Sequence, residues 1–469
     1  MKLYNTLTRQ KQPLQPLKTG HISLYSCGPT VYHYYHIGNL RNAVFNDTLV
    51  RALKLNDYTV DHIMNITDVG HLTSDADAGD DKLQSRAAEE SKTVEEVAEF
   101  YTAAFMQDME RMNVRAPQKY VKATDAIEQQ IAMVETLLEK GFAYQAQQAI
   151  YFDVTTLGDY GKLTGQRLDQ KEVGARSDVV TDPDKHHPWD FALWFFTVGH
   201  FADHSMRWNS PWGDGFPGWH LECSAIIERE LGTTIDIHTG GVDHIGAHHT
   251  NEIAQSEAAH DGAALATTWL HNEFLLVDGR KMSKSLGNTY TLDDSIKRGY
   301  DPIALRLLYL QSHYRSQQNF TWEALDAATN LLERFRAWAD AQFQDGSGTV
   351  GDSVFRPILD ALRAAISDDL NTPVVLATAM KLLDRADQEG TMPTKAQVSE
   401  IDRLLGLRLV ADSYDITPEQ KAILAEREGA RQAKDYTASD AARAQLRKNG
   451  IEIEDTPYGP RWRRLTIRA

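Results

Sequence analysis

The stretch HISLYSCGPTVYHYYHIGN, residues 21–39, decides the fold of this chain. Its first six residues alternate and are rich in β-forming side chains, which predicts a strand. Gly28 and Pro29 then mark a loop, and helical spacing begins near Ile37. YTVDHIMNITD, residues 58–68, predicts a second strand. Strand, loop, helix and strand make a βαβ unit, so we expect a parallel sheet whose ligand-binding loop follows its first strand.

The rest of the chain is arranged around this unit. Residues 114–188 resemble an insertion between two halves of the sheet, and the second half resumes near Trp194 with a strand at 233–241. Apolar residues recur at helical spacing from 321 to 341, and we expect three further helices that end near Leu407. A polar stretch at 411–417 leads to a small C-terminal unit.

Composition limits the class of protein. A chain of 469 residues contains about three domains, and its 42% hydrophobic and 25% charged residues are typical of soluble globular proteins. No apolar run reaches the ~20 residues that span a bilayer, and the first 12 residues lack the apolar core of a signal peptide. We therefore expect a cytoplasmic protein.

The net charge of −17 argues against non-specific binding of nucleic acid over the whole surface. The last stretch, residues 456–469, differs because it contains four arginines and no acidic residue. We expect contacts with a polyanion there rather than elsewhere.

Cys27 and Cys223 are the only cysteines, and neither belongs to a disulfide framework. His248 and Glu252 are four residues apart, so on a helix they share one face. Two thiols, one imidazole and one carboxylate are enough to hold one tetrahedral zinc ion. His249 is the adjacent alternative ligand; on the same helix it would point away from Glu252 and would line the pocket as a hydrogen-bond donor.

Two segments suit the binding of phosphate. His36, Gly38 and Asn39 stand at the start of the first predicted helix, where free N–H groups and the helix dipole favour an anion. The pentapeptide KMSKS contains Lys281 and Lys284 in a loop, where two lysines can clamp a triphosphate. A polar surface loop and a solvated basic turn are the plain alternatives for these segments.

Together, HIGN and KMSKS form the paired signature of class I aminoacyl-tRNA synthetases. CGPTVY at 27–32, PGWHLECSAI at 217–226 and HHTNE at 248–252 are similar to cysteinyl-tRNA synthetases in particular. Other similar segments occur in order along nearly the whole chain: LYNTLTR at 3–9, NITDV at 65–69, DFALW at 190–194, SPWG at 210–213, EIAQSE at 252–257, DDLNTP at 368–373 and GIEIEDTPYGPRW at 450–462.

This resemblance implies an α/β fold with a Rossmann-type parallel-sheet catalytic domain, an inserted connective domain, an α-helical bundle and a small anticodon-binding domain. The implied boundaries are 1–113 and 189–265 for the two catalytic halves, 114–188 for the connective domain, 266–320 for the stem-contact region with KMSKS, 321–410 for the bundle and 411–469 for the anticodon-binding domain. In the last domain Trp462 either stacks on a base or packs on its own domain.

The resemblance also implies a cysteine–tRNA ligase that uses ATP with Mg²⁺ and holds one zinc ion per chain, which selects the substrate thiolate. Its implied zinc ligands are Cys27, Cys223, His248 and Glu252. His36, Asn39, Lys281 and Lys284 would be catalytic; His36, Gly38, Asn39, Gly241, Asp243 and Lys284 would bind ATP; Gly28, Thr67 and Trp219 would bind cysteine. Core packing is an equal alternative for Trp219. The expected partners are tRNA(Cys), L-cysteine and ATP, without a membrane, and the expected state is a monomer.

Two other functions fit parts of the sequence. One is an adenylate-forming ligase that joins cysteine to a small amine, and the other is a non-catalytic tRNA-binding paralogue. The basic C-terminal segment argues against the first, and the complete signatures argue against the second. Three segments depart from the family pattern: HIGN replaces HIGH, AHHTNE replaces PHHENE, and residues 70–81 form an extended acidic loop without a functional account.

Overall fold

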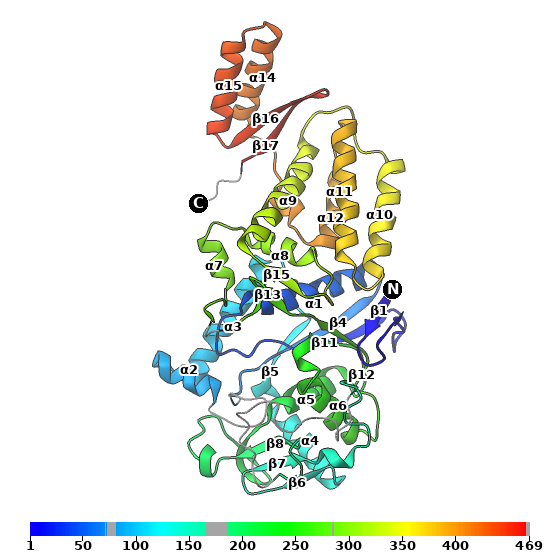
Figure 1. Ribbon diagram of the computed structural model, residues 1–469, viewed down its shortest axis with the longest axis vertical. Helices are drawn as coiled ribbons and strands as arrows, with labels where there is room; N and C mark the ends of the chain where they lie inside the picture. The colour runs from blue at the N-terminus through cyan, green and yellow to red at the C-terminus, as the bar shows by residue number, and fades with distance from the viewer. Residues whose placement is uncertain (71, 73–80, 166–184, 284–285, 466–469) are drawn as a thin grey trace. The chain divides into compact units, whose positions relative to one another are not determined.

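The computed structural model describes residues 1–70, 72, 81–165, 185–283 and 286–465 (Figure 1). The chain divides into two compact units. The first unit consists of Met1–Glu110, Arg115–Phe274 and Tyr314–Ser316, and the second of Arg111–Val114, Leu275–His313 and Gln317–Ala469. Most of the expected acidic loop, and residues 166–184 of the expected insertion, lie outside the described residues.

A five-stranded parallel sheet forms the centre of the first unit, in the order β12-β11-β3-β4-β5. Its strands are β3 (His21–Ser26), β4 (Thr59–Ile66), β5 (Lys119–Lys122), β11 (Ile235–Gly241) and β12 (Ala266–Asn272). Helix α1 (Ile37–Leu55) connects β3 to β4. The predicted βαβ unit and the α/β fold class are thereby confirmed.

The strand order reverses at β3. From β3 the chain proceeds outward through β4 and β5 on one side, whereas β11 and β12 follow on the other side. In open parallel sheets, ligands bind outside the carboxyl ends of the strands at such a reversal point. Cys27 directly follows β3 and Gly241 ends β11, so both lie at this point.

An antiparallel sheet is inserted between the two halves, in the order β6-β7-β8-β10-β9. Its strands are β6 (Ala143–Gln145), β7 (Ala149–Phe152), β8 (Phe191–Phe196), β9 (Trp208–Ser210) and β10 (Gly213–Pro217). The expected boundary of 188 therefore falls before three of its strands, and β5, within the expected insertion, belongs to the parallel sheet. The apolar run of β8 is buried at all six positions, and such a run fits the centre of either sheet.

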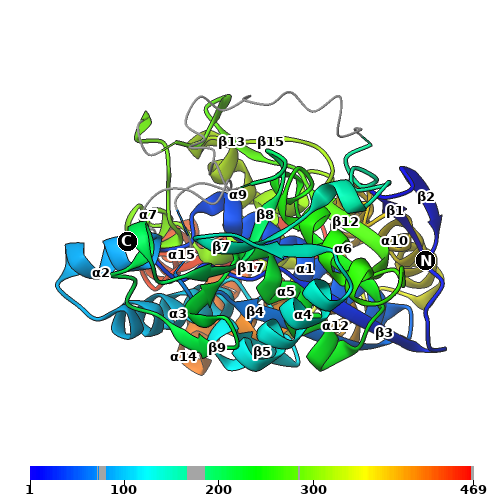
Figure 2. The ribbon, with the colours of Figure 1, turned by 90° about the horizontal axis from the view of Figure 1, so that it is seen from below.

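Helices α5 (Trp219–Leu231) and α6 (His248–Ala259) contact each other, and both contact α4 (Ile127–Glu139) (Figures 1 and 2). Helix α5 also contacts β4. Two further helices, α2 (Lys82–Glu90) and α3 (Val94–Arg111), lie between β4 and β5 in sequence, and a short hairpin of β1 (Lys2–Asn5) and β2 (Gln10–Pro13) precedes the sheet. Helices α5 and α6 pack together, so side chains from both can reach the point where the strand order reverses.

The second unit is mainly helical. It begins with the small sheet of β13 (Leu275–Val277), β14 (Arg280–Lys281) and β15 (Gln318–Phe320). Its helices are α7 (Leu292–Lys297), α8 (Pro302–Leu310), α9 (Trp322–Asp340), α10 (Asp352–Ser367), α11 (Thr372–Glu389), α12 (Lys395–Leu405) and α13 (Leu409–Asp412). Helix α9 occupies the range that apolar spacing predicted. No helix in the described part of either unit is both long and apolar enough to cross a membrane.

The C-terminal part of the second unit combines α14 (Pro418–Gln432), α15 (Tyr436–Lys448) and the hairpin of β16 (Ile451–Thr456) and β17 (Gly459–Arg464). Trp462 is 5% exposed and belongs to a buried cluster with Leu446 and Ile453. The packing interpretation of Trp462 therefore holds, and its ring does not present a face to a base. The exposed aromatic residues of this part are Tyr436 and Tyr458, at 66% and 44%.

We predict that Trp462→Ala lowers the free energy of opening of this C-terminal part by about 3–5 kcal/mol, because it removes a buried aromatic side chain. Native-state amide hydrogen exchange of β16 and β17 in the full chain measures this quantity. The neighbouring Arg463 is exposed, so Arg463→Ala should change it by less than about 0.5 kcal/mol. Equal protection in the two variants would contradict the packing role.

Candidate metal and nucleotide site

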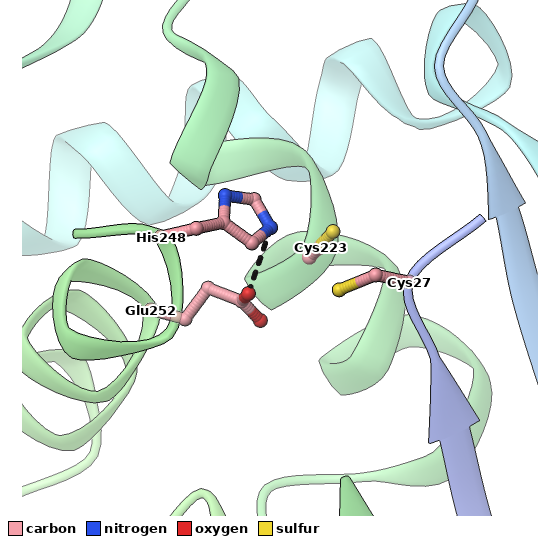
Figure 3. Close-up of side chains that lie close together, drawn as sticks. All are labelled: Cys27, Cys223, His248 and Glu252. Carbon is pink, nitrogen blue, oxygen red and sulfur yellow. Dashed lines mark ion pairs between the residues drawn. The ribbon is translucent and has the colours of Figure 1, made fainter. Parts of the chain in front are cut away.

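Four potential metal ligands converge at the reversal point of the sheet (Figure 3). Cys27 follows β3, Cys223 lies within α5, and His248 and Glu252 lie one turn apart on α6. One donor atom from each residue lies within 4.8 Å of all the others. Donors bound to one tetrahedral zinc lie about 3.3–3.8 Å apart, given bond lengths of about 2.0–2.3 Å. The four donors are therefore close to the spacing that a single ion needs.

The burial of these donors supports a cation among them. Cys27 is 6% exposed, Cys223 1%, His248 2% and Glu252 0%. Oε1 of Glu252 lies 2.9 Å from Nε2 of His248, and Oε2 lies 2.8 Å from Nε2 of His238. A buried carboxylate is costly unless a positive charge compensates it, and a protonated His248 or a metal ion can supply that charge. Two sulfur donors, one imidazole and one carboxylate fit zinc in chemistry as well as in spacing.

The ionisation of the four groups is interdependent. Burial opposes the charged form of Cys223, but the contacts with Cys27 and His248 outweigh it and lower its pKa to about 7. For Cys27, burial and the neighbouring Cys223 raise the pKa well above its usual value. Burial also opposes the charged form of His248, but Glu252 raises its pKa to about 10. Before any metal binds, the charged form of His248 is thus favoured at neutral pH, and Cys223 ionises more readily than Cys27.

Two further histidines touch the donors. Nε2 of His238 lies 2.8 Å from Oε2 of Glu252, and Nε2 of His249 lies 3.3 Å from Sγ of Cys27. The expectation that His249 points away from Glu252 is wrong, because the two groups lie 3.9 Å apart. Residues three apart on a helix also share a face, which explains the error. Cys27, His238, His249 and Glu252 consequently form a second, overlapping set of donors within 4.8 Å.

Two of the three residues expected to bind cysteine adjoin these donors, since Gly28 follows Cys27 and Trp219 contacts His248. Gly28 donates its N–H to Asn65 Oδ1 at 2.7 Å, and a Cβ at Gly28 would lie 1.8 Å from the Asn65 carbonyl oxygen. Thr67 donates to Oε2 of the buried Glu222 at 2.9 Å. Trp219 begins α5 and stacks on His248, with ring centroids 4.5 Å apart.

The N–H groups at the start of α1, which we expected to be free for a phosphate, have a partner within the helix. His36 caps this helix, and its Nδ1 accepts hydrogen bonds from the N–H groups of Gly38 and Asn39 at 3.1 and 3.2 Å. These two N–H groups are therefore not free for an anion. Burial lowers the pKa of His36, so the neutral ring carries its proton on Nε2 and can donate from that atom.

Gly241 and Asp243, expected near adenosine, lie at the end of β11 and in the short helix η5 (Val242–His244). A Cβ at Gly241 would lie 2.3 Å from Oδ1 of Asp243, so the glycine permits this approach. The Asp243 side chain is 61% exposed and available to a ligand.

Lys281 belongs to the second unit, where it lies exposed on β14. Asn288 fixes the chain that follows, because its side chain accepts from Ser283 N at 2.8 Å and donates to the Lys281 carbonyl at 3.2 Å. Lys284 lies outside the described residues, so its expected role stays a prediction.

Sequence reasoning missed four residues of this region: the buried Glu222, His238 and His271, and the partly buried Thr6. Thr6, Glu222 and His238 lie within segments named above, whereas His271 does not, and only contacts across the fold show their partners. The one available signal was the concentration of histidine in the segments around 238–249 and 271.

Comparisons with protein families agree with this geometry. A family model described as "tRNA synthetases class I (C) catalytic domain" matches residues 13–330, and one described as "Cysteinyl-tRNA ligase anticodon binding domain" matches residues 413–463. A protein named cysteine–tRNA ligase from Treponema denticola is 40% identical over 99% of this chain and 100% of its own length. Cysteine–tRNA ligase 1 from Burkholderia lata is 43% identical, over 98% of this chain and 96% of its own length.

Solved structures of other class I synthetases share the fold at low identity. Methionyl-tRNA synthetase from Mycobacterium tuberculosis, in complex with methionyl-adenylate, aligns with a TM-score of 0.57 at 15% identity, covering 84% of this chain and 90% of that one. Leucyl-tRNA synthetase from Agrobacterium radiobacter, in a ternary complex with tRNA, aligns with a TM-score of 0.59 at 13% identity, covering 85% and 83%. These alignments support the fold class alone.

We predict that the two roles of His36 can be separated. His36→Ala removes the cap of α1 and should lower the free energy of unfolding by about 1 kcal/mol. Asparagine is a good cap residue, so His36→Asn should restore most of this stability without restoring the Nε2 donor. Denaturant titration of each variant measures its free energy of unfolding. An equal loss of stability in His36→Ala and His36→Asn would show that His36 does not stabilise the protein by capping α1.

Proposed function

Because this chain belongs to the cysteine–tRNA ligase family of class I aminoacyl-tRNA synthetases, we propose that it activates L-cysteine with ATP and transfers the product to tRNA(Cys). Relatives of this name align over nearly the whole chain, including its C-terminal domain. The small-amine ligase and the non-catalytic paralogue have no support, because neither explains a match that extends from the catalytic signatures through the anticodon-binding domain.

The convergence of four buried donors carries the proposal that the amino acid is cysteine. In the proposed site Cys27, Cys223, His248 and Glu252 hold one zinc ion. Zinc supplies a position that favours a thiolate, because it lowers the pKa of a bound thiol, whereas the serine hydroxyl has a far higher pKa. Apolar pockets separate similar side chains by only about 1–3 kcal/mol, so a thiolate-specific bond explains selection better than shape alone.

The other residues orient the substrate for attack. Gly28 and Thr67 line the proposed cysteine pocket beside the donors, and Trp219 closes it next to His248. The carboxylate of cysteine then attacks the α-phosphorus of ATP, and pyrophosphate leaves. This chemistry requires alignment and neutralisation of charge more than covalent catalysis.

On the phosphate side, the proposed roles follow from the donors that remain available. His36 donates from Nε2 to a phosphate oxygen. The side chain of Asn39 accepts a hydrogen bond from the backbone N–H of His36 at 3.3 Å and so holds His36 in place. Gly38 keeps the backbone open to the ligand. Lys281 and Lys284 neutralise the charge that develops on pyrophosphate, with Mg²⁺ bound to the phosphates. Gly241 and Asp243 contact adenosine.

The remaining proposals concern the protein as a whole. The C-terminal domain binds the anticodon of tRNA(Cys), with arginines of β17 near the polyanion. The protein acts in the cytoplasm as a monomer, without a membrane partner.

We predict that His248→Ala lowers bound zinc from one equivalent per chain to near zero and abolishes cysteine-dependent ATP–pyrophosphate exchange, because it removes an imidazole ligand. His249→Ala should keep the metal, since its ring belongs only to the overlapping set. His260→Ala, at the end of the same helix, is the matched control and should match the unmodified protein in both respects. Zinc analysis of dialysed protein and the exchange assay measure the two effects.

The reverse pattern, with zinc lost in His249→Ala and kept in His248→Ala, would overturn the assignment of ligands. Zinc at one equivalent in both variants would overturn the site itself.

We also predict that Lys284→Ala slows cysteine-dependent pyrophosphate exchange at least 100-fold and that Lys281→Ala slows it less, because both stabilise charge on the leaving group. Lys297→Ala is the control, since Lys297 is exposed at the end of α7. An unchanged rate in Lys284→Ala would assign the phosphate clamp to other residues.

A further inference from the structure

A chain of three side-chain contacts leads from Cys27 to the N-terminal segment of the first unit. Sγ of Cys27 lies 3.3 Å from Nε2 of His249. Nδ1 of His249 lies 2.7 Å from Nε2 of His271, and Nδ1 of His271 lies 2.8 Å from Oγ1 of Thr6. The four residues come from the loop after β3, from α6, from β12 and from the segment after β1. His249 is 0% exposed and His271 4%, so water does not replace these partners easily.

The surroundings hold the His249 ring in this chain. The indole of Trp269 lies 5.1 Å from the His249 ring on one side. Gly240 lies against another side of the ring and leaves room for it, because a Cβ at Gly240 would lie 2.6 Å from Cε1 of His249. The position of Thr6 is fixed as well, since its N–H donates to the Trp269 carbonyl at 2.8 Å. A ring held this tightly keeps one orientation toward Cys27.

A metal-bound thiolate fixes the direction of every hydrogen bond in this chain. A thiolate only accepts, so Nε2 of His249 must carry a proton. In a neutral ring Nδ1 is then bare and must accept from Nε2–H of His271. His271 Nδ1 is bare in turn and must accept the hydroxyl proton of Thr6. If His249 were itself a metal ligand through Nε2, it would make no hydrogen bond with Cys27, and the bonds to His271 and Thr6 would run in the opposite direction.

We propose that Thr6 and His271 are positioning residues that hold His249 in its Nε2–H tautomer, so that His249 donates a hydrogen bond to the Cys27 thiolate instead of binding the metal. This inference rests on the proposed function, because it requires Cys27 to bind the ion as a thiolate. An N–H donor withdraws charge from the sulfur, and such contacts beyond the ligands tune a metal site. The sulfur then donates less charge to the ion, which leaves the ion more attractive to the incoming substrate thiolate.

Cobalt(II) in place of zinc gives a direct readout, since its sulfur-to-metal charge-transfer absorption reports the charge on the thiolates. The test compares the full-length protein, Thr6→Val, which removes the hydroxyl with little change in shape, and Thr6→Ser, which keeps it. The absorption of Thr6→Val should shift to longer wavelength, because the sulfur loses its hydrogen bond. Thr6→Ser should absorb as the unmodified protein does, and His271→Leu should shift in the same direction as Thr6→Val.

Three other outcomes would contradict a role for Thr6 and His271, and they distinguish a failure of this role from a failure of the metal site itself. If the unmodified protein binds cobalt without a sulfur charge-transfer band, the metal site of the proposed function is wrong. If it shows the band and Thr6→Val absorbs identically, only the positioning role is wrong. Loss of cobalt from His249→Ala would also overturn the inference, because His249 would then be a ligand.

Discussion

The convergence of four buried potential metal ligands at one point is the constraint on which the first unit depends. They come from a loop and two helices that are separated by up to 225 residues, and each is at most 6% exposed. Thiols and a carboxylate gathered without a cation would be unfavourable in such a place. The parallel sheet brings these residues together, because its order reverses at β3, and Cys27 at the carboxyl end of β3 meets the side chains from α5 and α6 there.

The proposed metal ligands are also close in sequence to the proposed phosphate-binding residues. The loop that begins at Cys27 continues through Gly28 to His36, which caps α1. Both ends of this loop are fixed, because Gly28 packs against Asn65 and His36 is hydrogen-bonded to Gly38 and Asn39. In the proposed function, the cysteine pocket and the ATP site therefore share one short segment of chain.

Sequence reasoning reached the parts that depend on local pattern. Alternation and helical spacing predicted the βαβ unit, and a spacing of four placed His248 and Glu252 on one face. It did not reach the parts that depend on contacts across the fold. The buried run of β8 fits either sheet, so the insertion extends beyond residue 188. Trp462 among arginines suggested a stacking surface, whereas its ring completes a core. The contact of His249 with Cys27 joins residues 222 apart and leaves no local signal.

The central claim is that the donors hold a zinc ion whose open position selects a thiolate. X-ray absorption at the zinc edge counts the sulfur atoms bound to the ion and tests this claim most directly. We predict two sulfur neighbours at about 2.3 Å in the free protein, three after addition of L-cysteine, and two after addition of L-serine. A sulfur count that stays at two in the presence of saturating cysteine would contradict the account.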